Sequence, residues 1–433
     1  MPYGGLDKKH TFFIYDNGRL FSQFAIALSQ QGHEVYYYTP FASNVYFKEY
    51  AVGLNIENIQ KPLYFFEKLL KYKKEDVTIM FPDVGMGDLA HFLKQMGYAV
   101  FAAGRGDILE FHRDWLKKEL PKLGLPVMDY AIVEGITALK NYLKKKGNER
   151  VIKLDIWRGD EETWFAQDVN KIDLKLNRLV SKFGPFAEEY FFIVEEKIEG
   201  DEEPGFDLIF DGEDYIKPYL WGYEIAKGPY CGVCDLKPPR IIQEVMDKLK
   251  PLLKKMDWRG FISTEMRVKN GKPYLIDVCA RSPHPLGLGY VVLYENFAEI
   301  IYKVARKIPV EAKIRGKFFV VLPIEIDSSL VDEWQHLILP KKTNQVLQYD
   351  KETYFAILTA SAAKVGEEYY HVPSVSSTIA VIVGVGNDLE KLRKGVKFLA
   401  QKVEVGGEKI TKIPEAEIDE AIDHIKRIIK EKT

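Results

Sequence analysis

Residues 260–281 read GFISTEMRVKNGKPYLIDVCAR, two runs of alternating polarity on either side of Lys269-Asn270-Gly271. Such alternation, broken by a short turn that contains Asn-Gly, predicts a β-hairpin. Because successive side chains of a strand point to opposite faces, we expect one apolar and one polar face. The expected apolar positions are even-numbered: Ile262, Met266, Val268, Tyr274, Ile276 and Val278. The expected polar positions are odd-numbered: Ser263, Glu265, Arg267, Asp277, Cys279 and Arg281.

The length of the turn determines whether Glu265 and Asp277 share a face. A two-residue Asn-Gly turn would pair odd positions with even ones and separate the two carboxylates. A three-residue loop, Lys269 to Gly271 with Gly271 in the left-handed region, pairs odd with odd. The apolar pattern favours the three-residue loop, because the other register would send half of the core residues into water. The sequence therefore predicts that Glu265 and Asp277 are diagonal neighbours, about 7–8 Å apart at the backbone.

Two carboxylates on one face of a hairpin can bind a shared cation. Oxygen ligands without a nearby histidine suit Mg²⁺ (or Mn²⁺), and Mg²⁺ takes one or two carboxylates together with substrate phosphates. The alternative is a half-exposed hairpin with scattered surface charges, because paired acids on strands are common. The hairpin alone leaves both interpretations open.

The composition is that of a soluble globular protein, with 46% hydrophobic and 29% charged residues in a chain of 433. That length predicts two to four domains or subdomains. A net charge of −2 gives no reason to expect a nucleic-acid or membrane partner. Three cysteines and the lack of a signal peptide argue against a secreted disulfide scaffold and predict a cytoplasmic location.

The first hundred residues alternate apolar runs with helical patterns, which predicts a parallel, doubly wound sheet. The expected strands are 11–17, 34–40, 76–83 and 98–104. Ligands of such sheets bind at the carboxyl ends of the strands, which here offer Asn17-Gly18-Arg19 and Asp83 to Asp88. The first strand is not followed by a GxGxxG motif, so a dinucleotide cofactor is not expected.

Two further segments suggest a phosphate and nucleotide site. Lys153 lies within the apolar run VIKLD and precedes a glycine turn at 158–160, which indicates a strand-borne cation beside a phosphate-binding loop. The apolar strand at 193–203, IVEEKIEGDEE, ends in acids that could meet an adenine edge and ribose hydroxyls. The alternatives are a lysine that snorkels from a sheet edge and a solvated acidic strand end.

The order and spacing of these pieces resemble the ATP-grasp superfamily. Arg113 on a helix precedes Lys153, the acids of 195–202, Glu265, and then the segment 277–281. Within the superfamily the chain most closely resembles the glycinamide ribonucleotide synthetase (phosphoribosylamine–glycine ligase) group. The resemblance implies a Rossmann-like α/β domain, the ATP-grasp domain with a lid at about 128–190, and a small α+β cap. The implied domain ranges are 1–108, 109–308 and 309–433.

The resemblance also implies roles for individual residues. Arg113 and Lys153 would contact ATP phosphates, and Arg281 would face the transferred phosphate. Glu265 and Asp277 would bridge Mg²⁺. The remaining nucleotide contacts would be the lid loop residues Arg158 and Gly159, the adenine hinge residues Glu195, Glu196, Lys197 and Ile198, and the ribose-binding Glu202.

Three departures from the family pattern stand out. Cys279 occupies the place of a metal-binding Asn, and a thiol is a poor Mg²⁺ ligand, so that a water or Ser263 would have to substitute. Two glycine-rich segments of the family are replaced by YDNGRLFSQF (15–24) and EIAKGPYCGVC (224–234). Both replacements fall where the acceptor would bind, so we expect retained ATP chemistry with a changed acceptor. The candidate substrate residues are Asn17, Gly18, Arg19, Asp83 and Lys227.

The implied reaction is ADP-forming: phosphoryl transfer from ATP to a carboxylate, then attack of an amine on the acyl phosphate. The expected partners are small-molecule substrates, and the expected state is a monomer or homodimer. A second interpretation is a grasp-fold protein that binds ATP for regulation without ligation, and a third is another grasp chemistry such as a carboxylase or kinase. Zinc at Cys231 and Cys234, joined by Cys279 and His284, is a weaker alternative, because a single CxxC is usually incidental.

Overall fold

The N-terminal part is a parallel sheet, as expected from the sequence; it has five strands in the order β3-β2-β1-β4-β5, and β3 was not among the predicted strands. The computed structural model describes residues 3–40, 59–60, 64–147, 149–154, 163–166, 173–198, 201–225, 228–373, 375–406, 408–409 and 414–432. The strand order reverses between β1 and β4, whose carboxyl ends therefore flank a potential ligand site. The elements are β1 (Thr11–Tyr15), α1 (Ser22–Gln30), β2 (Glu34–Tyr38), β3 (Ile59–Gln60), α2 (Phe65–Leu69), β4 (Val77–Met80), α3 (Gly87–Gln95) and β5 (Ala99–Phe101).

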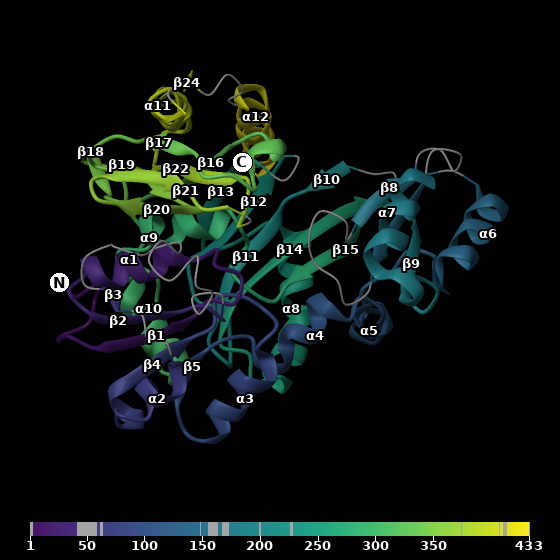
Figure 1. The fold of residues 1–433 in the computed structure, drawn as a ribbon, viewed down its shortest axis with the longest axis horizontal. Coiled ribbons are helices and arrows are strands. Elements are labelled where there is room, and N and C mark those ends of the chain that lie inside the picture. Colours follow the sequence, from purple (N-terminus) through teal and green to yellow (C-terminus); the bar gives the residue numbers. More distant parts are fainter. Residues whose placement is uncertain are drawn as a thin grey trace.

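A second, four-stranded antiparallel sheet projects from one end of the molecule (Figure 1), and we call it the lid sheet because it overlaps the lid predicted at about 128–190. It has its own apolar core, in which buried side chains of its strands meet those of two helices, as with Leu139 and Phe192. The chain reaches it through the short helices α4 (Ile108–Phe111) and α5 (Arg113–Glu119). The lid elements are β6 (Tyr130–Glu134), α6 (Ile136–Lys146), β7 (Arg150–Leu154), β8 (Thr163–Ala166), α7 (Asp173–Phe183) and β9 (Phe191–Glu196).

The largest sheet is antiparallel, with the order β10-β14-β11-β12-β13-β16-β22-β19-β18 and with β15 paired to β14. It runs unbroken through the pairing of β13 with β16, so the central and C-terminal parts of the chain share one sheet. The domain boundary near residue 308 stays a prediction. The strands are β10 (Asp201–Glu203), β11 (Gly205–Phe210), β12 (Tyr219–Glu224), β13 (Tyr230–Asp235), β14 (Gly260–Lys269), β15 (Lys272–Cys279), β16 (Phe318–Glu325), β18 (Leu347–Asp350), β19 (Thr353–Thr359) and β22 (Thr378–Gly386).

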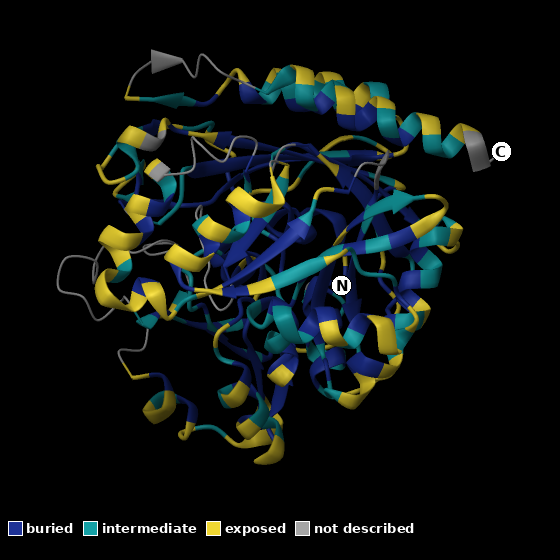
Figure 2. Cartoon of the chain, turned by 90° about the vertical axis from the view of Figure 1, so that its right-hand side faces the viewer, coloured by how far each residue is buried: buried dark blue, intermediate teal, exposed yellow. Residues whose placement is uncertain are grey.

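Helices cover both faces of this sheet, and Figure 2 shows buried strands inside partly exposed helices. The C-terminal part combines strands with two helices at the end of the chain, in keeping with the α+β character that the resemblance implies. None of the helices in the described ranges is long and apolar enough to span a membrane. The covering helices are α8 (Arg240–Lys255), α9 (Tyr290–Leu293), α10 (Phe297–Ala305), α11 (Leu389–Ala400) and α12 (Glu415–Lys432). A small outer sheet contains β17 (His336–Ile338), β20 (Ala362–Val365), β21 (Glu368–His371), β23 (Glu404–Val405) and β24 (Glu408–Lys409).

The hairpin of β14 and β15 is present, but its predicted three-residue loop is wrong. Lys269 pairs with Lys272, so the loop is the two-residue Asn270-Gly271 turn. Both turn residues have positive φ, 53° and 69°, as a tight hairpin turn requires. Near the turn, odd positions therefore pair with even ones. This is the register that the pattern of apolar residues disfavours.

A β-bulge corrects the register before the acids are reached. Met266 pairs with Leu275 and Glu265 with Asp277, which leaves Ile276 as the extra residue. The two carboxylates thus share a face, as expected, but they are directly opposed and not diagonal. The bulge also explains why Leu275 is buried while Tyr274 and Ile276, predicted to be core residues, are only half-buried.

The turn geometry predicts the effect of a substitution at Gly271. A Cβ there would meet no atom within 4 Å, so Gly271→Ala is opposed only by the left-handed backbone. We expect a loss of about 1 kcal/mol in the free energy of unfolding, measured with urea. Lys272→Ala, at the adjoining exposed position, is the control and should change stability very little. Equal stability of both variants would contradict the assigned turn.

Candidate active site

The acid pair of the hairpin meets two cations from other parts of the chain. Lys153 of β7 lies with its Nζ 3.3 Å from Asp277 Oδ2, and Arg113 of α5 lies with its Nε 3.3 Å from Asp277 Oδ1. Lys153 also donates to the carbonyl oxygen of Ile276 at 2.9 Å, and Arg113 donates to that of Leu154 at 3.0 Å. The lid sheet, the helix before it and the large sheet therefore converge on Asp277.

These contacts fix the charge states of the groups. Burial alone would raise the pKa of Asp277, but Lys153, Arg113 and Lys117 outweigh it and hold that pKa well below its ordinary value. Burial lowers the pKa of Lys153, and the charges of Asp277 and Glu195 more than offset this and raise it. Asp277 is therefore an anion and Lys153 a cation at neutral pH, as phosphate and metal binding require.

Lys117 is a third buried cation, which the sequence analysis did not identify. Its Nζ lies 3.1 Å from Glu195 Oε1, with both side chains 5% exposed. Burial lowers the pKa of Lys117, and the charge of Glu195 opposes that effect. Lys117 follows Arg113 by four residues, the spacing that places two side chains on one face of a helix, and this spacing could have revealed it.

The side chains of the predicted adenine hinge, residues 195–198, contact other parts of the protein. The Glu195 carboxylate faces inward to Lys117, and Glu196 forms an ion pair with Arg150 at 3.0 Å. Ile198 is buried, while the Nζ of Lys197 lies 4.8 Å from the centre of the Phe165 ring. The two acids thus serve ion pairs of the protein, and the backbone of this segment is what could pair with a base.

Arg281 occupies a second charged cluster, just beyond the end of β15. Its Nε lies 2.9 Å from Glu110 Oε1 and 3.6 Å from Asp83 Oδ1. The other oxygen of Glu110 accepts from the backbone N–H of Ala280 at 2.8 Å. Burial lowers the pKa of Arg281, but Glu110 and the other anions beside it raise it above its ordinary value. Glu110, on α4, was not singled out from the sequence.

The N-terminal loops contribute to this second cluster. Asp83 follows β4, and a Cβ on Gly18, in the loop after β1, would lie 2.4 Å from its carboxylate. A Cβ on Gly85 would lie 3.2 Å from the Asn17 amide nitrogen. The carboxyl ends of β1 and β4 thus bring three predicted substrate residues, Asn17, Gly18 and Asp83, close to Arg281.

Other predicted residues are less well placed by the structure. Arg19 has a left-handed backbone with a φ of 61° and is half-buried. Glu202 opposes Arg267 in the pairing of β10 with β14, but its side chain is outside the description. Arg158, Gly159 and Lys227 lie outside the described residues, so their predicted roles remain predictions.

The two carboxylates of the candidate site, those of Glu265 and Asp277, suit a divalent cation that is bound mainly by oxygens. Among the described residues, no group of three or more His, Cys, Asp and Glu side chains could hold a metal ion. Glu265 and Asp277 are directly opposed, and two carboxylates with substrate phosphates are what Mg²⁺ uses. Burial raises the pKa of the Cys279 thiol well above its usual range, so this sulfur stays protonated. Cys231 and Cys234 belong to different apolar cores, on opposite faces of β13.

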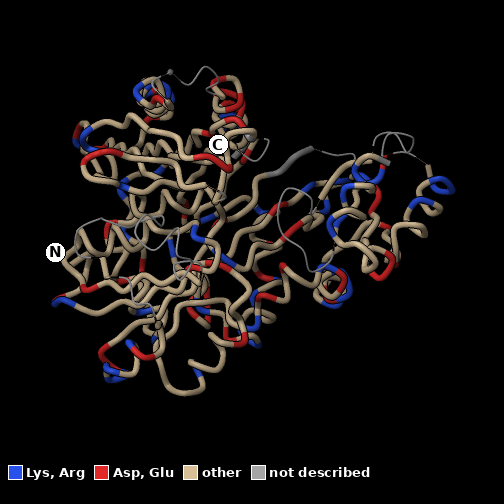
Figure 3. Tube along the Cα trace, viewed as in Figure 1, with Lys and Arg blue, Asp and Glu red and all other residues tan. Residues whose placement is uncertain are grey.

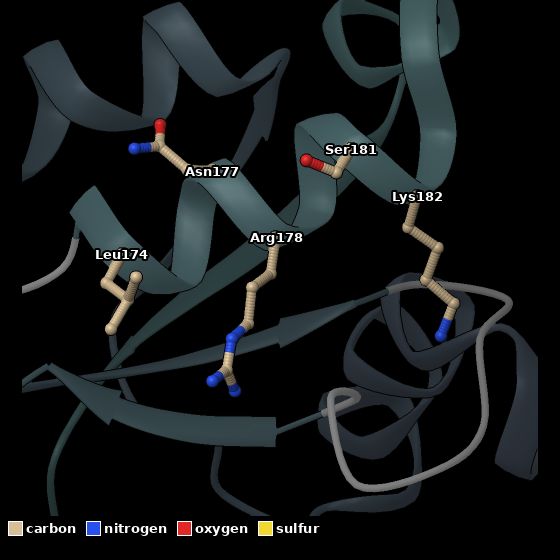
Figure 4. A pocket seen from close by; sticks show the side chains of 5 residues that line it. All are labelled: Leu174, Asn177, Arg178, Ser181 and Lys182. Atoms are coloured by element: carbon tan, nitrogen blue, oxygen red, sulfur yellow. The ribbon is translucent and has the colours of Figure 1, made fainter.

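A shallow pocket lies elsewhere, on the outer side of α7 (Figure 4). It is lined by Leu174, Asn177, Arg178, Ser181 and Lys182, and none of the predicted site residues is among them. Figure 3 shows Lys and Arg mixed with Asp and Glu where the lid meets the large sheet. We place the candidate site at that meeting point, because the converging buried charges are there and not at the pocket on α7.

This combination of a parallel N-terminal sheet, a lid sheet and a large antiparallel sheet is the ATP-grasp fold. The chain resembles solved phosphoribosylamine–glycine ligase from Thermotoga maritima, with a TM-score of 0.66, 19% identity, and coverage of 92% of this chain and 98% of that one. An ADP complex of N5-carboxyaminoimidazole ribonucleotide synthetase gives a TM-score of 0.59 at 14% identity, covering 91% and 97%. A biotin carboxylase from Campylobacter jejuni gives 0.63 at 12% identity, covering 92% of each chain.

At the level of sequence, the chain is similar to phosphoribosylamine–glycine ligases. The protein of that name from Streptococcus pneumoniae is 26% identical over 236 residues, 52% of this chain and 54% of the relative. The one from Lactococcus lactis is 27% identical over 163 residues, 35% of this chain and 38% of the relative. The chain spans about half the length of the curated relatives it matches. No family model matches the chain.

Proposed function

We propose that this chain is an ATP-dependent, ADP-forming carbon–nitrogen ligase that joins a carboxylate to an amine through an acyl phosphate. The observation that carries the proposal is the convergence of Lys153 and Arg113 on Asp277, directly opposite Glu265. Similarity to phosphoribosylamine–glycine ligases in sequence and to ATP-grasp enzymes in fold supports it.

Each group has a role in such a reaction. Glu265 and Asp277 would hold Mg²⁺ (or Mn²⁺), which neutralises phosphate charge when bound. Lys153 and Arg113 donate to the phosphate oxygens of ATP, and Lys117 adds a third positive charge beside them. Arg281 stabilises the charge on the transferred phosphate and the carboxylate, while Glu110 and Asp83 hold its guanidinium in place.

The lid would contribute by excluding water from the site. Lys153 belongs to the lid sheet and Asp277 to the large sheet, so their ion pair links two parts that ATP would also bridge. Closing these parts around the nucleotide protects an acyl phosphate from hydrolysis. The backbone of 195–198, together with Glu202 and the loop at Arg158 and Gly159, would complete the nucleotide contacts.

The acceptor is proposed to differ from phosphoribosylamine. The segments 15–24 and 224–234 replace the glycine-rich segments of the resembled family, and the first of them lies beside Arg281 in the structure. Asn17, Gly18, Arg19, Asp83 and Lys227 are the proposed substrate contacts. The remaining parts of the proposal are small-molecule substrates, a cytoplasmic location, and a monomeric or homodimeric state.

A second candidate function is a grasp-fold protein that binds ATP for regulation and ligates nothing. The loss of a metal-binding residue at Cys279 favours it, whereas the intact set of Lys153, Asp277 and Arg281 favours the enzyme. Release of ADP separates the two candidates, because a binding protein does not turn ATP over.

The test is Mg²⁺-dependent ADP release with panels of carboxylates and amines, including glycine and phosphoribosylamine generated in situ. We expect release that needs Mg²⁺, a carboxylate and an amine, and that phosphoribosylamine with glycine does not stimulate. Strong glycine-dependent release would instead place the protein with its purine-pathway relatives and contradict the changed acceptor. Nucleotide binding without ADP release from any pair would favour the regulatory function.

A further inference from the structure

Ser263 lies in a row of polar side chains next to the acid pair. It is paired with Asp207 of β11 on one side and with Cys279 of β15 on the other. Ser263 and Glu265 are two residues apart on β14, as are Cys279 and Asp277 on β15. The row therefore lies on the face that carries the acid pair, about 7 Å further along the strands.

The hydroxyl of Ser263 is held in one orientation. Its Oγ donates to Asp207 Oδ1 at 2.6 Å, and the Tyr230 hydroxyl donates to Asp207 Oδ2 at 2.6 Å. Asp207 is 4% exposed, so this carboxylate is shielded from competing water. Burial raises the pKa of Asp207 to about 6, which the two hydroxyl donors limit, and above that pH the carboxylate only accepts.

Glycines on two neighbouring strands leave room for the Tyr230 side chain. A Cβ on Gly222 would lie 2.2 Å from the Tyr230 hydroxyl oxygen, and one on Gly232 would lie 2.6 Å from the Tyr230 ring. The Tyr230 ring thus occupies space that only glycines leave free on β12 and β13. Tyr230 and Gly232 belong to the segment 224–234, which replaces a glycine-rich segment of the resembled family.

The fixed orientation of the Ser263 hydroxyl limits the hydrogen bonds that it can form. Its one proton is used by Asp207, so the oxygen can offer only lone pairs to a group on the other side. Cys279, directly across from Ser263, offers a sulfur, which is a weak acceptor and a poor partner for Mg²⁺. Of these two side chains, Ser263 is the one suited to the water shell of a hard cation.

We propose that Ser263, oriented by Asp207 and Tyr230, accepts a hydrogen bond from a water molecule on the divalent cation held by Glu265 and Asp277. It would do so in place of a direct ligand at position 279. The distance along the strand favours a bridging water, because a serine side chain is too short to span about 7 Å, and Mg²⁺ usually keeps several waters. Ser263 is thus a positioning residue, and the inference rests on the proposed function.

The test is titration of Mn²⁺ into ADP-saturated protein at pH 8, with free Mn²⁺ measured by electron paramagnetic resonance. We expect Ser263→Ala to weaken Mn²⁺ binding about tenfold, as the loss of an outer-sphere partner does. Cys279→Ala is the matched control across the strand pair and should leave Mn²⁺ affinity unchanged. Adding Cys279→Asn to Ser263→Ala should restore binding, because an amide oxygen there can reach the cation.

Folding effects are separated by two further measurements. Ser263→Cys keeps the size and a donor to Asp207 but removes the oxygen, so it should weaken Mn²⁺ binding like Ser263→Ala. Metal-free ADP affinity and the melting temperature show whether each variant is folded; a purely structural role would lower the melting temperature alone.

The failures of the two proposals are distinguishable. Unchanged Mn²⁺ affinity in folded Ser263→Ala or Ser263→Cys protein would overturn the role of Ser263 and leave the proposed function intact. A wild-type protein that binds neither ADP nor Mn²⁺ would overturn the proposed function and this inference with it.

Discussion

Replacing Asp277 with Asn is expected to reduce Mg²⁺-dependent ADP release by about a hundred- to a thousand-fold, the loss that follows when a preorganised charge is removed from the transition state. Asp277 is the residue on which the site converges, since Lys153 and Arg113 both contact it and Glu265 opposes it. An amide has the same shape but supplies no negative charge to the metal or to the two cations. The measurement is the rate of ADP release at saturating ATP and Mg²⁺.

The same substitution also affects stability. It leaves Lys153, which is 1% exposed, and Arg113 buried without their anion, and breaking a buried ion pair costs about 3–5 kcal/mol. We therefore expect a lower free energy of unfolding in urea, so ADP release is compared at a temperature where both proteins are folded. Asp350→Asn, which removes a surface ion pair with Lys391 but keeps an oxygen for the Glu352 N–H, is the control; it should leave ADP release unchanged and alter stability only slightly. Full ADP release from folded Asp277→Asn protein would refute the metal assignment.

Replacing Glu110 with Gln is expected to lower both stability and ADP release. Glu110 holds the Arg281 guanidinium at 2.9 Å and the Ala280 N–H at 2.8 Å, and a neutral amide can accept from only one of them. The loss of charge beside buried Arg281 should cost about 3 kcal/mol in the free energy of unfolding. ADP release should fall about tenfold or more, because Arg281 is no longer fixed toward the phosphate.

The control for Glu110 is Glu119→Gln, on the neighbouring helix. Glu119 pairs with Lys122, which is well exposed, and such pairs contribute little. Its loss should leave ADP release unchanged. If Glu110→Gln loses stability but retains full ADP release, then Arg281 does not depend on Glu110 for catalysis, and Glu110 has only a structural role.

The hairpin illustrates what the sequence could and could not predict. Alternation identified the strands and the shared face of Glu265 and Asp277, because the pattern of a strand is local. The turn was assigned wrongly, because a bulge at Ile276 restores the register five residues beyond the turn. A bulge leaves no clear signal in the alternation of a short strand. Here Tyr274 and Ile276 continue the pattern of apolar even-numbered positions across the bulge, so the sequence does not reveal it.

The charge partners were the other part that the sequence could not supply. The sequence identifies Lys153, Arg113 and Asp277 as separate candidates but not their contacts. Arg113 is 164 positions from Asp277 along the chain, and Lys153 is 124 positions from it. Lys117 could have been predicted, because it lies four residues after Arg113 and therefore on the same face of the helix. Glu110 could not have been predicted, because its role depends on an ion pair with Arg281 that only the folded chain forms. Tertiary contacts of this kind depend on how the three sheets are assembled.

The most direct test of the account is calorimetric titration of ADP into the wild-type chain, with and without Mg²⁺. The convergence of two buried cations, Lys153 and Arg113, on the acid pair predicts binding in the range of roughly 1 μM to 1 mM, typical of enzyme substrates, that Mg²⁺ makes tighter. Absence of ADP binding under both conditions would contradict the nucleotide site, and with it the ligase function proposed for this chain.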